Sequence, residues 1–472
     1  MKHNFRFALM AAAGVLACAA GAVEPPAPMQ PLPSANQIAW QEMELTAFCH
    51  FGINTFYNQE WGNGSEDPNR FYPANFDAAQ WVSALQSAGF KELILTCKHH
   101  DGFCLWPSAY TAHSVKASRW FKEREAAAPG SGDVVMAVAG ACHRAGMKFG
   151  VYLSPWDRNN SAYGKGAAYN TYYENQLREL LSHYGEVAEV WWDGAKGDNT
   201  PQEYDFDAWA AIVHQLQPAA VIFEGNYHTA DIRWVGNENG HASDACWPAV
   251  DEHKKPASAG SKWMPAESDV SIRPGWFYHS SEDSRVKSLS ELAGIYRDSV
   301  GHNSQLLLNV PPGAQGLITD FDKNRLEEFK GYLQAAFGTN LAAGAAAEAS
   351  NARGAGFEAG KALADEPNAY WAASDGVTNA SLTVNLGSVK HFNMIELQEP
   401  IQLGLRVTGY TLEVWAGGDW KVVAARQCIG HEALVSFPPV DASRVRLNVT
   451  SARACPAIRS IRVYNDPLAS QK

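Results

Sequence analysis

The sequence predicts an α/β fold, a (β/α)8 barrel of the TIM type, followed by an all-β sandwich. Three observations support this prediction. Short apolar runs alternate with helical patterns between residues 45 and 310, which is typical of parallel β/α units. Polar side chains gather at the ends of the predicted strands, as they do on the functional rim of such barrels. Beyond residue 355 the pattern changes to short alternating strands, which favours a sandwich.

The length and composition fit two globular units. At 472 residues the chain is longer than one ordinary domain, and its 19% charged and 11% aromatic residues are typical of a folded protein. The net charge of −12 provides no basic surface, so we do not expect a nucleic-acid partner. Residues 33–340 are predicted to form the barrel, residues 341–355 a linker and residues 356–468 the sandwich.

The N-terminus has the pattern of a secretory signal peptide, predicted to cover residues 1–22. Lys2 and Arg6 precede an apolar run that is too short to span a membrane, and residues 20–22 have the small-x-small form of a cleavage site. We therefore expect an exported protein, periplasmic or extracellular, with no membrane span. Cys18 could instead mark lipidation, although the residues before it fit that motif poorly.

Cysteine usage predicts buried thiols rather than a disulfide framework. Of the eight cysteines, seven remain once Cys18 is removed with the signal peptide, and an odd number forbids complete pairing. No CxxC pair with the spacing of a metal site is present. One bridge, between Cys428 and Cys455, could form in an oxidising compartment.

The barrel elements follow one another in order along the chain. “LTAFCHFGI” is the first predicted strand, and the helix after it begins at Asp77 and ends at Gly89. Helices separate the next strands, which read “ELILTCKHH”, “KFGVYLSPW”, “EVAEVWWDGA” and “AVIFEGN”. The sixth and seventh strands are predicted near Ile232 and Val270, and “QLLLNVPPG” is the last. A doubly wound open sheet is the alternative, but no GxGxxG fingerprint follows the first strand.

The sandwich elements begin after a helix through “NRLEEFKGYLQAAFG” and the alanine- and glycine-rich residues 341–355. The predicted strands read “SLTVNLG”, “NMIELQEP”, “YTLEVWAGGDWKVVA”, “ALVSFP”, “RVRLNVT” and “IRSIRVY”. Their short length and alternating pattern predict two packed antiparallel sheets.

Functional residues of a (β/α)8 barrel lie at the carboxyl-terminal rim, where its strands end. The predicted strand ends carry His50, Lys98, His99, His100, Asp101, Tyr152, Trp156, Asp193, Glu224 and Glu238. Histidines and a lysine at such ends can donate hydrogen bonds to substrate hydroxyls. This gathering of polar groups predicts an active site at the rim.

Polar side chains at this rim could serve three kinds of chemistry. A metal site is not favoured, because the adjacent side chains of His99 and His100 point to opposite faces of a strand. A serine hydrolase is not favoured, because the sequence has no GxSxG turn. Paired carboxylates remain, as in retaining glycoside hydrolysis, and Asp193 at the fourth strand end is placed to be the nucleophile. The second carboxylate stays open among Glu224, Glu238, Asp244 and Glu267.

Six motifs, in order, resemble one enzyme family. They read “HFGINTFYNQEWGNG”, “TCKHHDGFCLWPSAYTAHSV”, “GVYLSPWD”, “VWWDGAKGDN”, “RWVGNENG” and “SDVSIRPGWFYH”. Together they resemble the α-L-fucosidases of glycoside hydrolase family 29, in particular the branch that prefers α-1,3- and α-1,4-linked fucose on branched Lewis-type glycans. The resemblance covers residues 33–340. It implies a retaining exo-α-L-fucosidase that acts on fucosylated oligosaccharides or glycoconjugates through a covalent intermediate and requires no cofactor.

Position by position, the resemblance implies Asp193 as nucleophile and Glu238 as acid/base, with Glu267 as the rival for the second role. It implies sugar contacts for His50, Glu60, Trp61, His99, His100, Tyr152, Trp192 and Arg273. Adjacent side chains of a strand face opposite ways. One of the two tryptophans in “WWD” should therefore line the sugar pocket, and the other should pack away from the barrel axis.

The C-terminal unit resembles the discoidin or coagulation-factor-5/8 type C domain, through “NAYWAASDG” and “RSIRVY”. That resemblance implies glycan binding, with Trp371, Trp415 or Trp420 as candidates, or packing against the barrel. Some such domains bind a structural calcium ion, although no acidic cluster in this sequence requires one. Two alternatives for the whole chain stay open: a glycan-binding protein that has lost catalysis, and a hydrolase of a related sugar.

Overall fold

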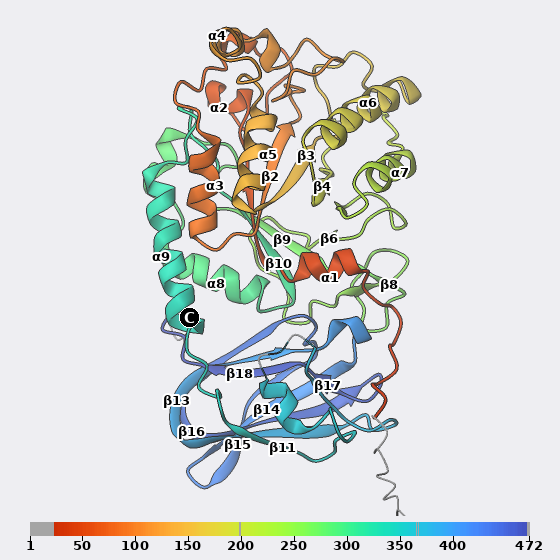
Figure 1. Ribbon diagram of the computed structural model, residues 1–472, viewed down its shortest axis with the longest axis vertical. Coiled ribbons are helices and arrows are strands. Elements are labelled where there is room, and N and C mark those ends of the chain that lie inside the picture. The colour runs from red at the N-terminus through yellow and green to blue at the C-terminus, as the bar shows by residue number, and fades with distance from the viewer. Residues whose placement is uncertain (1–22, 198–199, 365, 367, 470–472) are drawn as a thin grey trace, which may run out of the picture.

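The computed structural model describes residues 23–197, 200–364, 366 and 368–469. The predicted signal peptide lies outside the described residues. Figure 1 shows the barrel with its helices in the upper part of the view and the β-domain below it. The predicted fold class is confirmed, because eight parallel strands form one sheet and a separate antiparallel sheet follows.

The barrel strands share one direction and curve into a nearly closed sheet. They are β1 (Leu45–Cys49), β2 (Glu92–Lys98), β3 (Lys148–Leu153), β4 (Glu189–Trp191), β5 (Val221–Phe223), β6 (Arg233–Trp234), β9 (Ala266–Ser271) and β10 (Ser304–Asn309). Their order is β5-β4-β3-β2-β1-β10-β9-β6, and a parallel bridge from Phe223 to Ile232 brings the two outer strands together. The strands predicted near Ile232 and Val270 correspond to β6 and β9.

Helices cover the outside of this sheet (Figure 1). The longer ones are α3 (Ala78–Ser87), α5 (Val134–Ala145), α6 (Ala167–His183), α7 (Phe206–Leu216), α8 (Leu289–Ser299) and α9 (Asp320–Phe337). The shorter ones are α1 (Ala35–Gln41), α2 (Ile53–Tyr57) and α4 (Arg119–Ala127), with 3-10 turns η1 (Pro68–Arg70), η2 (Val115–Ala117), η3 (Ser280–Arg285), η4 (Ala359–Leu363) and η5 (Ile401–Leu403). Asp77, as its position predicted, caps α3 by accepting from free backbone amides, and Asp133 caps α5 in the same way.

Between β5 and β9 the chain forms no helix. It forms instead β6 and a two-stranded ribbon of β7 (Ala249–Val250) and β8 (Lys262–Trp263). This irregular stretch is the part of the barrel where strand and helix alternation is weakest. It brings the segment after β6, with Glu238, over the carboxyl-terminal rim.

The C-terminal domain is a sheet of long, bent antiparallel strands. Its strands are β11 (Ala346–Ala349), β13 (Ala380–Gln398), β14 (Val407–Ala416), β15 (Asp419–Arg426), β16 (Ala433–Ala452) and β18 (Ser460–Tyr464), and β12 (Trp371–Ala372) pairs with β17 (Ala457–Ile458). β13 and β16 each contain two of the predicted short strands, because register shifts bend them without ending them. β11 lies inside the predicted linker 341–355, which is a correction: its small alternating residues pair with β13.

The β-domain packs against the amino-terminal ends of the barrel strands. The backbone N–H of His431 donates to Oδ1 of Asn303, which directly precedes β10, at 2.7 Å. Arg297 of α8 forms a buried ion pair with Asp466 at 2.9 Å. The domain therefore lies on the face of the barrel opposite to the carboxyl-terminal rim. Trp371 is fully buried, so it is unavailable to a glycan.

All seven cysteines in the described residues are buried free thiols, as predicted. The candidate bridge between Cys428 and Cys455 is wrong. The Cys428 thiol lies against the carbonyl of Cys246, and the Cys455 sulfur accepts from the Arg406 guanidinium at 3.3 Å. In the part of the chain that the structure describes, no helix has the length and apolar character needed to cross a membrane.

Three carboxyl groups lie inside the barrel, below the rim: Glu92, Glu189 and Glu267, all fully buried. Indole N–H groups reach two of them, from Trp40 to Glu189 at 2.7 Å and from Trp191 to Glu267 at 2.8 Å. Burial raises the pKa of all three, that of Glu92 to about 8. The low-polarity interior thus favours their neutral forms.

We expect a pH-dependent stability from Glu92. Its folded pKa of about 8 lies above the ordinary value, so its contribution to stability is fully present below the unfolded pKa. That contribution is lost as the pH rises through about 8. The thermal midpoint should fall between about pH 5 and about pH 9, and E92Q should reduce this fall by roughly 2–4 °C. Scanning fluorimetry of the wild type and of E92Q across this pH range measures the thermal midpoints.

The matched control is E42Q, which alters an exposed carboxyl group at the same end of the barrel. In E42Q, the thermal midpoint should fall with pH as steeply as it does in the wild-type protein. If the thermal midpoint of E92Q also fell as steeply as in the wild type, the pKa of Glu92 would not differ between the folded and unfolded states.

Candidate active site

A pocket of about 100 Å³ opens at the carboxyl-terminal rim of the barrel, where the strand ends predicted it. It is lined by Phe48, His50, Glu60, Trp61, His99, His100, Tyr152, Trp191, Asp193, Ala195, Glu238, Asp269 and Trp276. Eight of the ten predicted site residues are among them, and Trp192 and Arg273 are not.

Asp193 directly follows the short strand β4 and turns its carboxylate into the pocket. Oδ1 accepts from the backbone N–H of Ala195 at 2.7 Å, and Oδ2 accepts from the Tyr152 hydroxyl at 2.9 Å. Burial and then the charge of Asp193 raise the pKa of Tyr152, so this phenol keeps the proton that it donates. Nε2 of His100 lies 3.7 Å from Oδ2. A donor on each oxygen fixes the carboxylate in one orientation.

The three pocket histidines are neutral imidazoles. Burial lowers the pKa of His50 to about 3, that of His100 to about 4, and that of His99 as well. Nδ1 of His50 lies 2.9 Å from Oδ1 of Asn309, an oxygen that only accepts, so Nδ1 carries the proton and Nε2 is an acceptor. An acceptor nitrogen of this kind can receive a hydrogen bond from a sugar hydroxyl.

The tryptophan assignment from the resemblance is off by one residue. Trp191 lines the pocket, stacked on Phe223 with ring centroids 4.0 Å apart, whereas Trp192 packs outward against Trp209 of α7. The reason is the two-residue repeat of the strand, which places Trp191 and Asp193 on the same face. Trp192 is therefore not a pocket residue.

Arg273 also lies outside the pocket, which corrects the predicted sugar contact. Its guanidinium is buried and pairs with Asp322 at 2.8 Å and with Asp283 at 3.0 Å. A buried guanidinium needs such partners because burial of an unpaired charge is costly. Both partners follow Arg273 in the chain and anchor the loop that carries Trp276.

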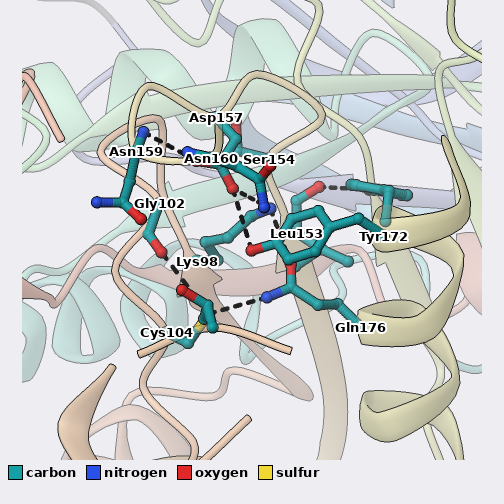
Figure 2. Close-up of polar contacts among 12 residues, drawn as sticks. Lys98, Gly102, Cys104, Leu153, Ser154, Asp157, Asn159, Asn160, Tyr172 and Gln176 are labelled. Atoms are coloured by element: carbon teal, nitrogen blue, oxygen red, sulfur yellow. Dashed lines mark hydrogen bonds and ion pairs between the residues drawn. The ribbon is translucent and has the colours of Figure 1, made fainter. Parts of the chain in front are cut away.

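Lys98 does not line the pocket either. Figure 2 shows that its side chain lies in a buried polar network. Its ammonium donates to Asp157 at 3.1 Å and to Gln176 at 3.0 Å, and none of these side chains is exposed to more than a trace. Asp157 accepts in turn from the backbone N–H groups of Asn159 and Asn160. The network fixes the loop after β3, and lysine is not a sugar ligand here.

Ser154, at the start of that loop, holds His100. Its hydroxyl donates to the carbonyl of Trp156 at 2.7 Å and lies 2.7 Å from Nδ1 of His100. Because the hydroxyl proton is already used, Nδ1 of His100 is the donor. Nε2 of His100 is then left as an acceptor beside Asp193.

Glu60 and Trp61 form the rim of the pocket. The Glu60 carboxylate accepts from the backbone amides of Trp276 and Phe277 and lies 2.6 Å from Nε2 of His279. It thereby ties the loop after β1 to the loop after β9. Trp61 is 58% exposed at the pocket mouth and makes a T-shaped ring contact with His100, with centroids 5.6 Å apart.

Of the four candidates for the second carboxylate, Glu238 lines the pocket, and Trp276 donates to it at 3.3 Å. Glu267 lies deeper in the barrel and binds Trp191. Glu224 pairs with Lys254, and Asp244 pairs with Arg426 of the β-domain. The geometry therefore favours Glu238 as the partner of Asp193.

Sequence reasoning missed Asp269 and Trp276 as pocket residues. Asp269 lies within β9, and its spacing from Glu267 puts both side chains on the inner face of the barrel. That parity was the available signal for Asp269. The motif “SDVSIRPGWFYH” contains both Asp269 and Trp276, but Arg273 is the residue of this motif to which the resemblance gives a role. Among the described residues, no group of three or more His, Cys, Asp or Glu side chains is arranged to hold a metal ion.

Comparison with known proteins identifies the family of each part of the chain. The family model described as Alpha-L-fucosidase matches residues 33–336, and the model described as F5/8 type C domain matches residues 346–461. The chain is 42% identical to Alpha-L-fucosidase 1 of Arabidopsis thaliana over 93% of this chain and 89% of that protein. It is 25% identical to human Plasma alpha-L-fucosidase over 62% of this chain and 61% of that one.

Among solved structures, it resembles a Ruminococcus gnavus fucosidase of glycoside hydrolase family 29 in complex with fucose, with a TM-score of 0.87 and 34% identity over 94% of this chain and 97% of that chain. The chain therefore belongs to the α-L-fucosidases of glycoside hydrolase family 29, and it carries a C-terminal F5/8 type C domain.

Proposed function

We propose that this α-L-fucosidase works with retention of configuration, with Asp193 as nucleophile and Glu238 as acid and then base. The observation that supports this most is that both carboxyl groups line one small pocket, while the other candidate carboxylates are engaged elsewhere. A retaining mechanism needs such a pair on the two sides of the scissile bond.

In the first step, an oxygen of Asp193 attacks the anomeric carbon while the bond from that carbon to the leaving oxygen breaks. The Glu238 carboxyl donates its proton to the leaving oxygen. A fucosyl ester of Asp193 results. The hydrogen bonds from Ala195 and Tyr152 orient the carboxylate for this attack and remain as donors to the ester oxygens.

In the second step, Glu238 takes a proton from a water molecule, and the resulting hydroxide attacks the anomeric carbon. The ester bond breaks, and Asp193 leaves as a carboxylate. Two displacements at one carbon give net retention. The acceptor nitrogens of His50 and His100 bind sugar hydroxyls, and the wall of Phe48 and Trp191 packs against the C6 methyl of fucose.

We further propose an exo action on α-1,3- and α-1,4-linked fucose of branched glycans. A pocket of about 100 Å³ takes one terminal sugar and not a chain interior. The exposed Trp61 at the mouth offers an apolar surface for the rest of the glycan. The motifs of that branch in the sequence support the linkage.

The remaining expectations stay proposals as well. We propose that the protein is exported, on the strength of its N-terminal leader pattern. We propose that the reaction needs no cofactor, since side chains of the pocket can supply both the nucleophile and the proton. For the C-terminal domain we propose a packing role, supported by its contacts with the barrel face opposite to the pocket.

Removal of the nucleophile should abolish turnover. We expect D193G to lower kcat/KM on an aryl α-L-fucoside by roughly 10³- to 10⁵-fold. Azide should restore part of the rate, because it can occupy the space of the lost carboxylate and attack the same carbon. D244N, at a carboxylate outside the pocket, is the control and should keep wild-type activity. Near-normal turnover by D193G would exclude Asp193 as nucleophile.

The loss of activity caused by removing the acid/base should depend on the leaving group of the substrate. We expect E238A to lower kcat/KM by roughly 10²- to 10⁴-fold on fucosides with poor leaving groups and far less on activated aryl fucosides. E267Q should leave the ratio between these substrates unchanged, because Glu267 lies below the pocket. If E267Q and not E238A changed this ratio, the acid/base role would belong to Glu267.

Substrate choice and stereochemistry can be read together by proton NMR. We expect release of fucose from Lewis trisaccharides, with little from 2′-fucosyllactose, and the first product should be the α-anomer. Initial formation of β-L-fucose would contradict retention. Equal rates on 2′-fucosyllactose and the Lewis compounds would contradict the linkage preference.

A further inference from the structure

Two carboxyl groups that line the pocket, Glu60 and Asp269, have no part in the proposed two-carboxylate mechanism. Glu60 is held by the backbone amides of the loop after β9, which leaves the role of Asp269 unexplained. Asp269 lies within β9 and is only 4% exposed, yet it lines the pocket together with Asp193 and Glu238. Burial raises the pKa of Asp269 to about 7, to which the nearby carboxylates Glu238 and Asp193 add. A buried acid at this depth calls for hydrogen-bonding partners on both oxygens.

One oxygen of Asp269 has a protein partner. The indole Nε1 of Trp234 donates to Oδ1 at 2.7 Å. Trp234 is itself fixed, since its backbone N–H donates to Glu224 at 3.0 Å. The four residues after Trp234 lead directly to Glu238, so Asp269 anchors the start of the segment that carries the acid/base.

The end of the same segment is anchored beside Asp269. Asn239 forms an antiparallel bridge with Val270, the next residue of β9. Gly240, with a φ of +77°, allows this close approach, because a Cβ there would lie 2.8 Å from the Val270 side chain. The segment from Trp234 to Gly240 therefore spans Asp269.

The second oxygen, Oδ2, accepts no hydrogen bond from any other residue in the described part of the chain. It is not enclosed by protein either, since it is absent from the fully buried, unpartnered polar atoms of the described residues. As Asp269 lines the pocket, the space before Oδ2 is the sugar site. A hydroxyl of a sugar bound there is the group that can complete its hydrogen bonds.

We propose that Asp269 is a further active-site carboxyl group, which holds the Glu238 segment through Trp234 and hydrogen-bonds a fucose hydroxyl through Oδ2. This inference rests on the proposed function. The hydroxyl belongs to the fucose unit and not to the rest of the glycan, because Asp269 lies on a barrel strand below the rim while the leaving group must extend through the mouth. No proton or bond is transferred by Asp269.

The test is a set of substrates that lack one hydroxyl each. We measure kcat/KM of the wild type and of D269N on an aryl α-L-fucoside and on its 2-, 3- and 4-deoxy analogues. D269N keeps an oxygen for the Trp234 indole but loses the negative charge and one acceptor. We expect a loss of roughly 10- to 100-fold on the parent fucoside.

On one deoxy analogue, kcat/KM of the wild type and of D269N should differ little, because that analogue lacks the hydroxyl that Asp269 binds. On the other two analogues, the loss in kcat/KM from the D269N substitution and the loss from the missing hydroxyl should be additive. Additive losses on all three would overturn the proposed hydroxyl contact. A purely structural role of Asp269 would lower all four rates alike.

Two variants serve as controls. W234F removes the indole donor but leaves Asp269, and it should affect poor leaving groups through the Glu238 segment while keeping the deoxy pattern of the wild type. D231N alters a carboxyl group that accepts from Ile222 outside the pocket, and it should change neither rate nor pattern. Melting temperatures of all variants are compared, so that a D269N loss explained by unfolding would also count against the proposal.

L-fucose binding separates this inference from the proposed function. By titration calorimetry, we expect D269N to bind L-fucose roughly 10- to 100-fold more weakly than the wild type. If the wild type released no fucose from any fucoside, the proposed function would fail, and the binding comparison would still test Asp269. Equal affinities of wild type and D269N would overturn the proposal.

Discussion

The buried ion pair between Lys98 and Asp157 holds the part of the barrel rim on which the pocket is built. Burying two charges costs several kcal/mol per ion, so the pair is stable only with further hydrogen bonds, which Gln176 and the amides of the loop after β3 supply. That loop in turn places Ser154 against His100. It also reaches the loop after β1, through Asn159 to the Gly64 carbonyl, and thereby supports Trp61 at the mouth.

The same chemical group has different tasks at different depths of the barrel. Glu267 lies in the interior, where burial favours its neutral form, and its oxygen fixes the indole of Trp191. Trp191 stacks on Tyr152, and Tyr152 donates to Asp193 at the surface of the pocket. A chain of contacts thus links a buried neutral acid to the partly buried Asp193 carboxylate. Interior polarity, costly in itself, is used here to fix the orientation of the Asp193 carboxylate.

The parts of the fold that could be predicted are those set by local pattern. Strand and helix alternation identified the barrel, and Asp193 followed from its place at a strand end. The inward-facing tryptophan of β4 also follows from Asp193, because residues two apart on a strand share a face. The resemblance implies Trp192 instead, and this is wrong because Trp191 lines the pocket. Arg273 was misplaced because its partner Asp322 lies far along the chain, on α9. Long-range ion pairs leave no local pattern.

The β-domain and the pocket occupy opposite faces of the barrel, which separates stability from chemistry. The domain contacts the amino-terminal face, where Asn303 precedes β10 and binds the His431 backbone. Barrel enzymes use that face for stability and the carboxyl-terminal face for catalysis. Residues at the pocket can therefore change without disturbing the domain contact. The irregular stretch between β5 and β9 belongs to the catalytic face, because it supplies the Glu238 segment and lacks the helix that would have buried it.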